Sequence, residues 1–188
     1  YVSDRSGYFH IYRYGYDGKL INQVTKGDWD MIKVSGINPV TQTIYYLSAE
    51  TGGLEQQFYS IKFDGSEKRK LSDIAGFHDI NMSPDTKYYL DKYSNINTPT
   101  HIALRNDKGT QLKMLEDNAA VNTFLSTKIY STPELINFKT SDGVSIDGYI
   151  IKPFNFDATK KYPVVFTVYG GPSSHDVFNK FYTDGWQQ

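Results

Sequence analysis

The sequence has 188 residues, a formal net charge of −1 and 39% hydrophobic residues. This composition is typical of a folded globular chain and excludes an intrinsically disordered one. The near-neutral charge gives no reason to expect nucleic acid or an anionic membrane surface as a partner. Cysteine is absent, which excludes disulfides, thiolate zinc sites and cysteine nucleophiles.

Aromatic residues are frequent, with 16 Tyr and 11 Phe. Because aromatic side chains favour strands, we expect a mainly β protein. No apolar run approaches the ~18 residues of a membrane-spanning helix. The sequence begins at Tyr1 in strand-like sequence and has no initiator Met, so we expect both ends to be cut from a longer chain.

Short aromatic and β-branched runs, separated by turn residues, extend from Tyr1 to about Arg105. Asp17-Gly18 between the first two runs is a strong hairpin signal. The first four predicted strands are residues 8–14, 20–24, 31–37 and 43–47.

This pattern then repeats. The Asp-Gly turn at Gly18 recurs at Gly65, which is 65 − 18 = 47 residues later, and the Tyr-Tyr-Leu at 45–47 recurs at 88–90. A third copy begins at residues 100–105. A four-strand unit recurring every ~40–50 residues is the signature of β-propeller blades, and such units assemble into rings. The alternative is a plain antiparallel sandwich of about eight to ten strands.

A different pattern follows the repeats. Asn118 is a good helix N-cap, and Val121, Phe124 and Leu125 share one helical face. We therefore predict a short helix here and a domain boundary near residue 120.

Two further runs, at residues 133–140 and 144–153, flank Ser141-Asp142-Gly143. The turn residues between them predict a β-hairpin. Residues 178–188 give only a weak signal, compatible with a helix or an irregular loop.

The run Lys161-Tyr-Pro-Val-Val-Phe-Thr-Val-Tyr-Gly-Gly-Pro172 is apolar and bounded by turn signals. Such a run predicts a strand buried on both faces. A buried strand that ends in a glycine turn is where open α/β sheets place ligands, and in α/β-hydrolases a loop of this kind supplies part of the oxyanion hole. An ordinary buried strand with a tight turn is the alternative.

This order of elements resembles the prolyl oligopeptidase family of serine peptidases, and within it the dipeptidyl peptidase IV branch. Three stretches carry the resemblance: Leu20-Ile-Asn-Gln-Val-Thr-Lys-Gly-Asp-Trp-Asp30, Leu115-Glu-Asp-Asn-Ala-Ala120 and Val168-Tyr-Gly-Gly-Pro172. The resemblance spans essentially the whole chain. It implies that residues 1–120 are the last blades of a β-propeller and that residues 121–188 are the first strands of an α/β-hydrolase domain.

The resemblance also implies roles for individual residues. Tyr169 matches the family's oxyanion-hole tyrosine, and Gly170, Gly171, Pro172 and Ser173 would line the rim of the active site. No cofactor or metal is expected.

The resemblance further implies a substrate and a setting. Members of this branch remove dipeptides from peptide N-termini, with Pro or Ala in the second position. The full-length protein is expected to be an exported homodimer.

The sequence departs from the family by lacking a nucleophile. A serine hydrolase of this kind has its Ser, Asp and His in that chain order, with the serine in a Gly-x-Ser-x-Gly motif, and no such motif occurs here. The acidic pair that holds the substrate amine is also expected outside this sequence. We therefore expect the chain to be inactive alone. The alternative function is a non-catalytic, propeller-type binding module.

The four histidines are scattered singly, which disfavours a metal site. We expect His10, His78 and His101 to be structural. Ser173, Ser174, His175 and Asp176 do not form a triad, because sequence neighbours do not generally adopt that geometry.

Overall fold

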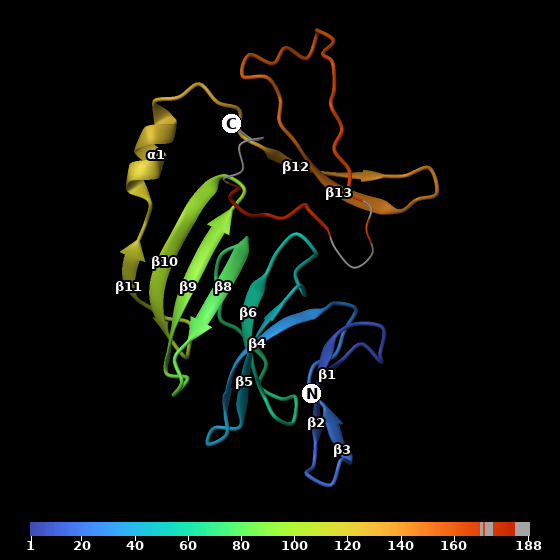
Figure 1. The fold of residues 1–188 in the computed structure, drawn as a ribbon, viewed down its shortest axis with the longest axis vertical. Helices are drawn as coiled ribbons and strands as arrows, with labels where there is room; N and C mark the ends of the chain where they lie inside the picture. The colour runs from blue at the N-terminus through green and yellow to red at the C-terminus, as the bar shows by residue number, and fades with distance from the viewer. Residues whose placement is uncertain (170, 172–174, 183–188) are drawn as a thin grey trace.

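The computed structural model describes residues 1–169, 171 and 175–182, and the fold is almost entirely antiparallel β-structure (Figure 1). The first three sheets, in chain order, contain β1 (Val2–Ser3), β2 (His10–Tyr14), β3 (Leu20–Gln23), β4 (Met31–Asn38), β5 (Thr43–Ser48), β6 (Gln57–Lys62), β7 (Arg69–Lys70), β8 (Phe77–Met82), β9 (Tyr88–Asn95), β10 (Thr98–Asn106) and β11 (Gln111–Glu116). After them come α1 (Ala119–Ser126), β12 (Glu134–Lys139) and β13 (Ser145–Ile150).

Each sheet pairs strands that are neighbours in the sequence. The orders are β1-β2-β3, β4-β5-β6-β7 and β8-β9-β10-β11, with β12-β13 as a separate hairpin. Four-stranded meanders of this kind, following one another along the chain, are built like propeller blades. A single sandwich of two large sheets, the alternative left open by the sequence, is not what these residues form.

The predicted repeat is visible as the same type of turn at three places in the chain. The amides of Gly18, Gly65 and Gly109 donate to the carbonyls of Gly15, Lys62 and Asn106, and each glycine has a positive φ. Glycine adopts this backbone conformation at little cost. Each turn joins the last two strands of its sheet, so the spacing of these glycines in the sequence marks the blades correctly.

Two apolar cores lie between successive sheets, and β5 contributes side chains to both of them. Ile44 and Tyr46 join the core between the first and second sheets, whereas Tyr45 and Leu47 join the core between the second and third. Successive side chains of a strand point to opposite faces, so a continuous apolar run serves two cores at once. In the recurring run at 88–90, Tyr89 joins the second of these cores, whereas Tyr88 is 47% exposed.

The predicted helix is present as α1, and its N-cap position is Asn118. This residue has the left-handed conformation (φ 51°, ψ 32°), and its side chain does not cap the helix. Its Nδ2 donates instead to the carbonyl oxygen of Thr100 in β10. Val121 and Phe124, on the predicted apolar face of the helix, are both exposed. The hydrogen bond of Asn118, and not burial of this apolar face, therefore joins the start of the helix to the last blade.

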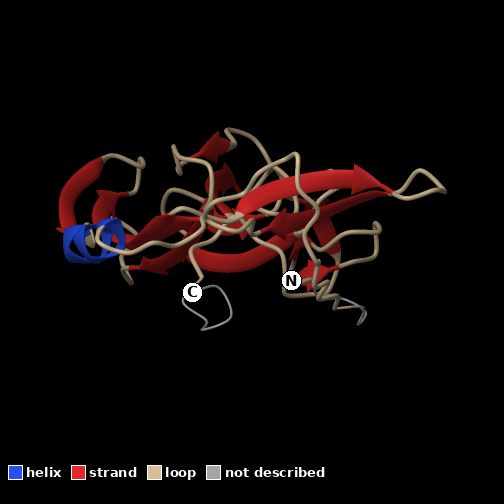
Figure 2. Ribbon diagram, turned by 90° about the horizontal axis from the view of Figure 1, so that it is seen from above, coloured by secondary structure: helices blue, strands red, loops and turns tan. Residues whose placement is uncertain are grey.

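The predicted hairpin at 133–153 is confirmed by β12 and β13, which pair from Glu134 with Ile150 to Lys139 with Ser145. The view from above shows α1 and this hairpin at opposite ends of the molecule (Figure 2).

The prediction of a buried strand at 163–168 is wrong for this structure. These residues form no strand, and Val165, Phe166 and Val168 are 93%, 85% and 84% exposed. A buried strand needs neighbouring strands to accept its backbone hydrogen bonds, and β12 and β13 pair only with each other among the described strands. The described residues therefore contain propeller-type sheets and no α/β-hydrolase domain. None of their helices is long and apolar enough to span a membrane.

Candidate active site

Tyr169, the predicted oxyanion-hole residue, lies at the end of the exposed apolar segment and is itself 57% exposed. Its ring folds back over its own turn. A Cβ atom added at Gly171 would lie 2.5 Å from the Tyr169 hydroxyl oxygen, so the tyrosine side chain would have to move to accept a larger residue there.

Only two of the five predicted site residues are described by the structure, namely Tyr169 and Gly171. Gly170, Pro172 and Ser173 lie outside the described residues, and so does Ser174.

The chain returns to the blades after the predicted rim, at residues 175–182. In Figure 1 this segment, drawn in red, crosses between the ends of β8 and β9 and the β12–β13 hairpin. The His175 Nε2 atom lies 3.0 Å from the carbonyl oxygen of Gly53, in the loop between β5 and β6. The Phe178 ring makes an edge contact with Phe77 of β8 at a centroid distance of 5.5 Å.

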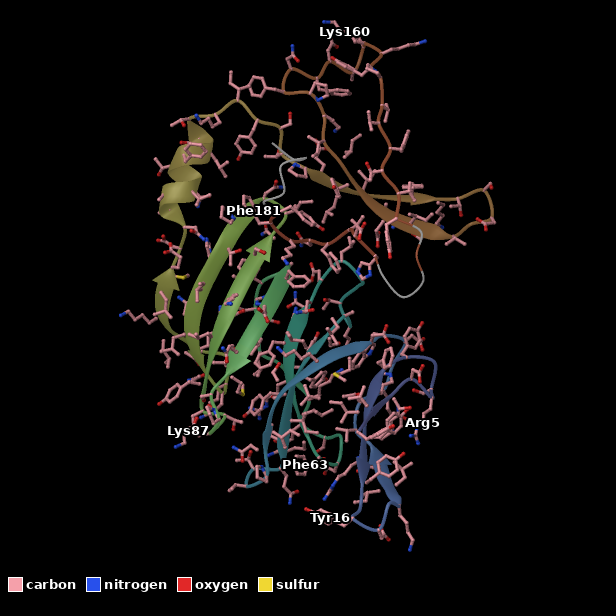
Figure 3. All side chains as sticks on the ribbon, in the orientation of Figure 1. Arg5, Tyr16, Phe63, Lys87, Lys160 and Phe181 are labelled. Carbon is pink, nitrogen blue, oxygen red and sulfur yellow. The ribbon has the colours of Figure 1, made fainter. Side chains whose placement is uncertain are left out.

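Asn179 forms the polar centre of this contact. Its backbone amide donates to the Leu54 carbonyl oxygen at 2.7 Å, and its side-chain Oδ1 accepts from the Ile96 backbone amide at 3.0 Å. Its Nδ2 donates to Glu55 Oε1 at 3.4 Å. Two residues later, the Phe181 amide donates to the Ser94 hydroxyl at 3.3 Å, at the end of β9 (Figure 3). The segment is therefore bonded to both the second and the third sheet.

Sequence reasoning missed this anchorage. Residues 178–188 have no clear periodicity, and the contacts join residues 83 to 125 positions apart, as for Asn179 with Ile96 and with Leu54. The one local signal was the aromatic spacing of Phe178 and Phe181, which does not identify a partner.

His10 and His78 are structural, as predicted. Both are fully buried, at 1% and 0% exposure. His10 lies within hydrogen-bond distance of Thr25 and of the Gly27 carbonyl, and His78 contacts Asp91. Among the described residues, no group of three or more metal-ligating side chains comes together.

No triad geometry surrounds His175 within the described residues. Its ring stacks at an angle on Phe178, and its Nε2 faces a backbone carbonyl. The neighbouring Asp176 accepts a hydrogen bond from the Tyr182 hydroxyl through its own carbonyl oxygen. Ser173 and Ser174 lie outside the described residues, so the rejection of a local Ser-His-Asp arrangement remains a prediction.

Residues 1–100 match the family model described as the dipeptidyl peptidase IV N-terminal region. The chain belongs to this dipeptidyl peptidase IV family. The match covers the first three sheets up to the start of β10, which are therefore blades of the family's propeller.

Individual relatives extend the similarity beyond the propeller blades. A probable dipeptidyl peptidase 4 of Aspergillus flavus is 29% identical over 190 residues, covering 99% of this chain and 24% of that protein. A probable dipeptidyl-aminopeptidase B of Trichophyton verrucosum is 31% identical over 186 residues, covering 93% of this chain and 20% of that protein.

The crystal structure of Porphyromonas gingivalis dipeptidyl peptidase 4 superposes with a TM-score of 0.93 at 34% identity. The match covers all of this chain and 26% of that one. The chain therefore has the fold of the matching part of that structure. It spans about a fifth to a quarter of the length of these relatives.

Proposed function

We propose that this chain is part of a serine exopeptidase that removes Xaa-Pro or Xaa-Ala dipeptides from the N-termini of peptides. The observation that carries this proposal is the similarity of nearly the whole chain to proteins named dipeptidyl peptidases. In the proposed division, residues 1–120 are the last propeller blades. Residues 121–188 supply the first elements of the catalytic domain.

Tyr169 has one chemical role in this proposal. A serine elsewhere in the whole enzyme attacks the carbonyl carbon of the second residue, and the carbonyl oxygen becomes an oxyanion. The Tyr169 hydroxyl donates a hydrogen bond to that oxyanion, an interaction stronger in the transition state than in the ground state. Collapse of the intermediate releases the shortened peptide and leaves an acyl-enzyme, which water then hydrolyses.

The exposure of Tyr169 supports this role. The side chain is 57% exposed, unlike the core tyrosines Tyr46 and Tyr89 at 0% and 2%, so a substrate can reach it.

The test is Tyr169→Phe in the full-length protein, with kcat and KM measured on a chromogenic Xaa-Pro amide. Loss of one oxyanion donor is expected to lower kcat by ~10²–10³-fold and to leave KM nearly unchanged. An unchanged kcat would remove Tyr169 from the mechanism. If the unaltered full-length protein showed no turnover, a non-catalytic propeller module would be the better account.

Two further properties are proposed from the family resemblance alone. The whole protein is exported, to the periplasm or cell surface, and it forms a homodimer. Fractionation of cells with an antibody against the chain tests the first property, and light scattering of the purified full-length protein tests the second.

A further inference from the structure

The segment at residues 175–182 follows Tyr169 in the sequence and is bonded to the ends of two blades. We propose that Asn179 is a positioning residue for the peptidase reaction: it holds the Tyr169 loop in place against the propeller. This inference rests on the proposed function, since it assigns Asn179 a role that acts through Tyr169.

The contacts of Asn179 reach two different blades. Leu54 and Glu55 belong to the loop between β5 and β6 in the second sheet, whereas Ile96 belongs to the turn between β9 and β10 in the third. Asn179 bonds to all three at 2.7–3.4 Å. A displacement of either loop would break at least one of these bonds. The position of the segment at residues 175–182 therefore depends on the positions of both blades.

The chemistry at this position calls for a side-chain amide. The Ile96 amide needs an acceptor, while the Glu55 carboxylate needs a donor. An asparagine side chain carries one acceptor oxygen and one NH₂ donor, which satisfies both. A carboxylate at position 179 would keep the acceptor, lose the donor and repel Glu55.

The neighbours of Asn179 give the segment a fixed direction. Phe178 makes an edge contact with the Phe77 ring, and the Lys180 Nζ lies 4.8 Å from the centroid of the same Phe77 ring. The Phe181 amide bonds to Ser94 at the end of β9. Contacts before and after Asn179 therefore prevent the segment from sliding along the blade ends.

The link to catalysis is the short chain between the two residues. Tyr169 and Asn179 are only 179 − 169 = 10 positions apart. A shift of ~1 Å in a catalytic group can cost up to ~10²-fold in rate, even when the altered residue lies away from the chemistry. Releasing Asn179 is therefore expected to lower kcat through Tyr169, with little change in KM.

The experiment uses the full-length protein and a donor–acceptor swap. Asn179→Asp is expected to lower kcat about tenfold on an Xaa-Pro amide. Adding Glu55→Gln to it reverses the hydrogen bond, because the introduced amide now donates to the introduced carboxylate. The other oxygen of Glu55 accepts from Gln57 and Thr51, and the introduced amide oxygen can keep those two bonds. The double variant should recover most of the lost kcat.

Two comparisons separate positioning from a general structural role. Asn95→Asp makes the same chemical change at the end of β9, where the asparagine side chain bonds to Tyr93 and Asn97 within the described part of the chain, and it should leave kcat unchanged. In a Tyr169→Phe background, Asn179→Asp should have no further effect on kcat, because the group it positions is already gone.

Each outcome decides a different point. Turnover that is absent in the unaltered protein contradicts the proposed function itself. An active protein in which Asn179→Asp leaves kcat unchanged overturns the positioning role. So does a loss that is the same in the Tyr169→Phe background, or a loss that Glu55→Gln does not repair.

Discussion

His78 Nδ1 and Asp91 Oδ1 lie 2.8 Å apart in the middle of the third sheet, and neither side chain is more than 2% exposed. The other Asp91 oxygen lies 3.2 Å from Arg105 Nε. Arg105 in turn reaches Asp73 at 3.2 Å and the Gly109 carbonyl at 2.9 Å. One buried carboxylate thus joins strands β8, β9 and β10 of a single blade.

Removal of this carboxylate should be costly. Asp91→Ala removes the carboxylate that contacts the buried side chains of Arg105 and His78. Breaking a buried ion pair in this way typically lowers the unfolding free energy by ~3–5 kcal/mol. Urea unfolding of the chain measures it. Asp79→Ala, on the exposed face of β8, is the control and should cost less than ~0.5 kcal/mol. Equal effects of the two substitutions would contradict the importance of the buried pair.

The repeated turn allows a comparison of two equivalent glycines. An alanine Cβ at Gly109 would lie 2.7 Å from the Leu71 carbonyl oxygen, whereas one at Gly18 would meet nothing within 4 Å. Both glycines have a positive φ, +87° and +77°. Gly18→Ala should therefore cost only the backbone term of ~1–2 kcal/mol.

Gly109→Ala should cost ~1–3 kcal/mol more than that, because the blade contact must also shift. Urea midpoints of the two variants, compared at equal m-values, give the difference. Similar midpoints would show that the close approach of the blades is not needed.

Stability should fall at alkaline pH because of Tyr59. Burial, and then the negative charges of Glu50 and Glu55, raise the pKa of Tyr59 to about 12. In the unfolded chain a tyrosine loses its proton near pH ~10. Between pH 10 and about 12 the unfolded state therefore binds fewer protons, and the unfolding free energy falls as pH rises.

The slope from this residue is at most ~1.4 kcal/mol per pH unit, and below pH ~10 its contribution is constant. Urea unfolding at a series of pH values tests this, with Tyr59→Phe expected to reduce the alkaline slope. A slope identical in the variant would assign the effect to other tyrosines.

The 188-residue chain by itself should hydrolyse no Xaa-Pro amide. It contains no Gly-x-Ser-x-Gly motif, and an oxyanion donor without a nucleophile cannot form an acyl-enzyme. The assay is release of the chromophore by the purified chain, with the full-length protein as the positive control. Activity that follows the chain through purification would refute this expectation.

Much of the fold could be predicted because its signals are local. The turn at Gly18 and Gly65, the paired tyrosines of β5 and β9 and the hairpin at β12–β13 each depend on residues that are close in the sequence. Backbone conformation, turn chemistry and the alternation of side chains operate over a few residues. The sequence therefore identified the blades, their spacing and the short helix.

The candidate site depended on contacts that sequence periodicity does not contain. Residues 163–168 have the composition of a buried strand, yet a strand is formed only where another strand accepts its hydrogen bonds. The pairing of His78 with Asp91, and the anchoring of Asn179 on loops 83 and 124 residues away, are likewise decided by how the sheets are arranged in space. The sequence by itself determined the local elements and the family. Only the tertiary structure decided which of them meet, because long-range partners are selected by packing of the whole chain and not by any short stretch of it.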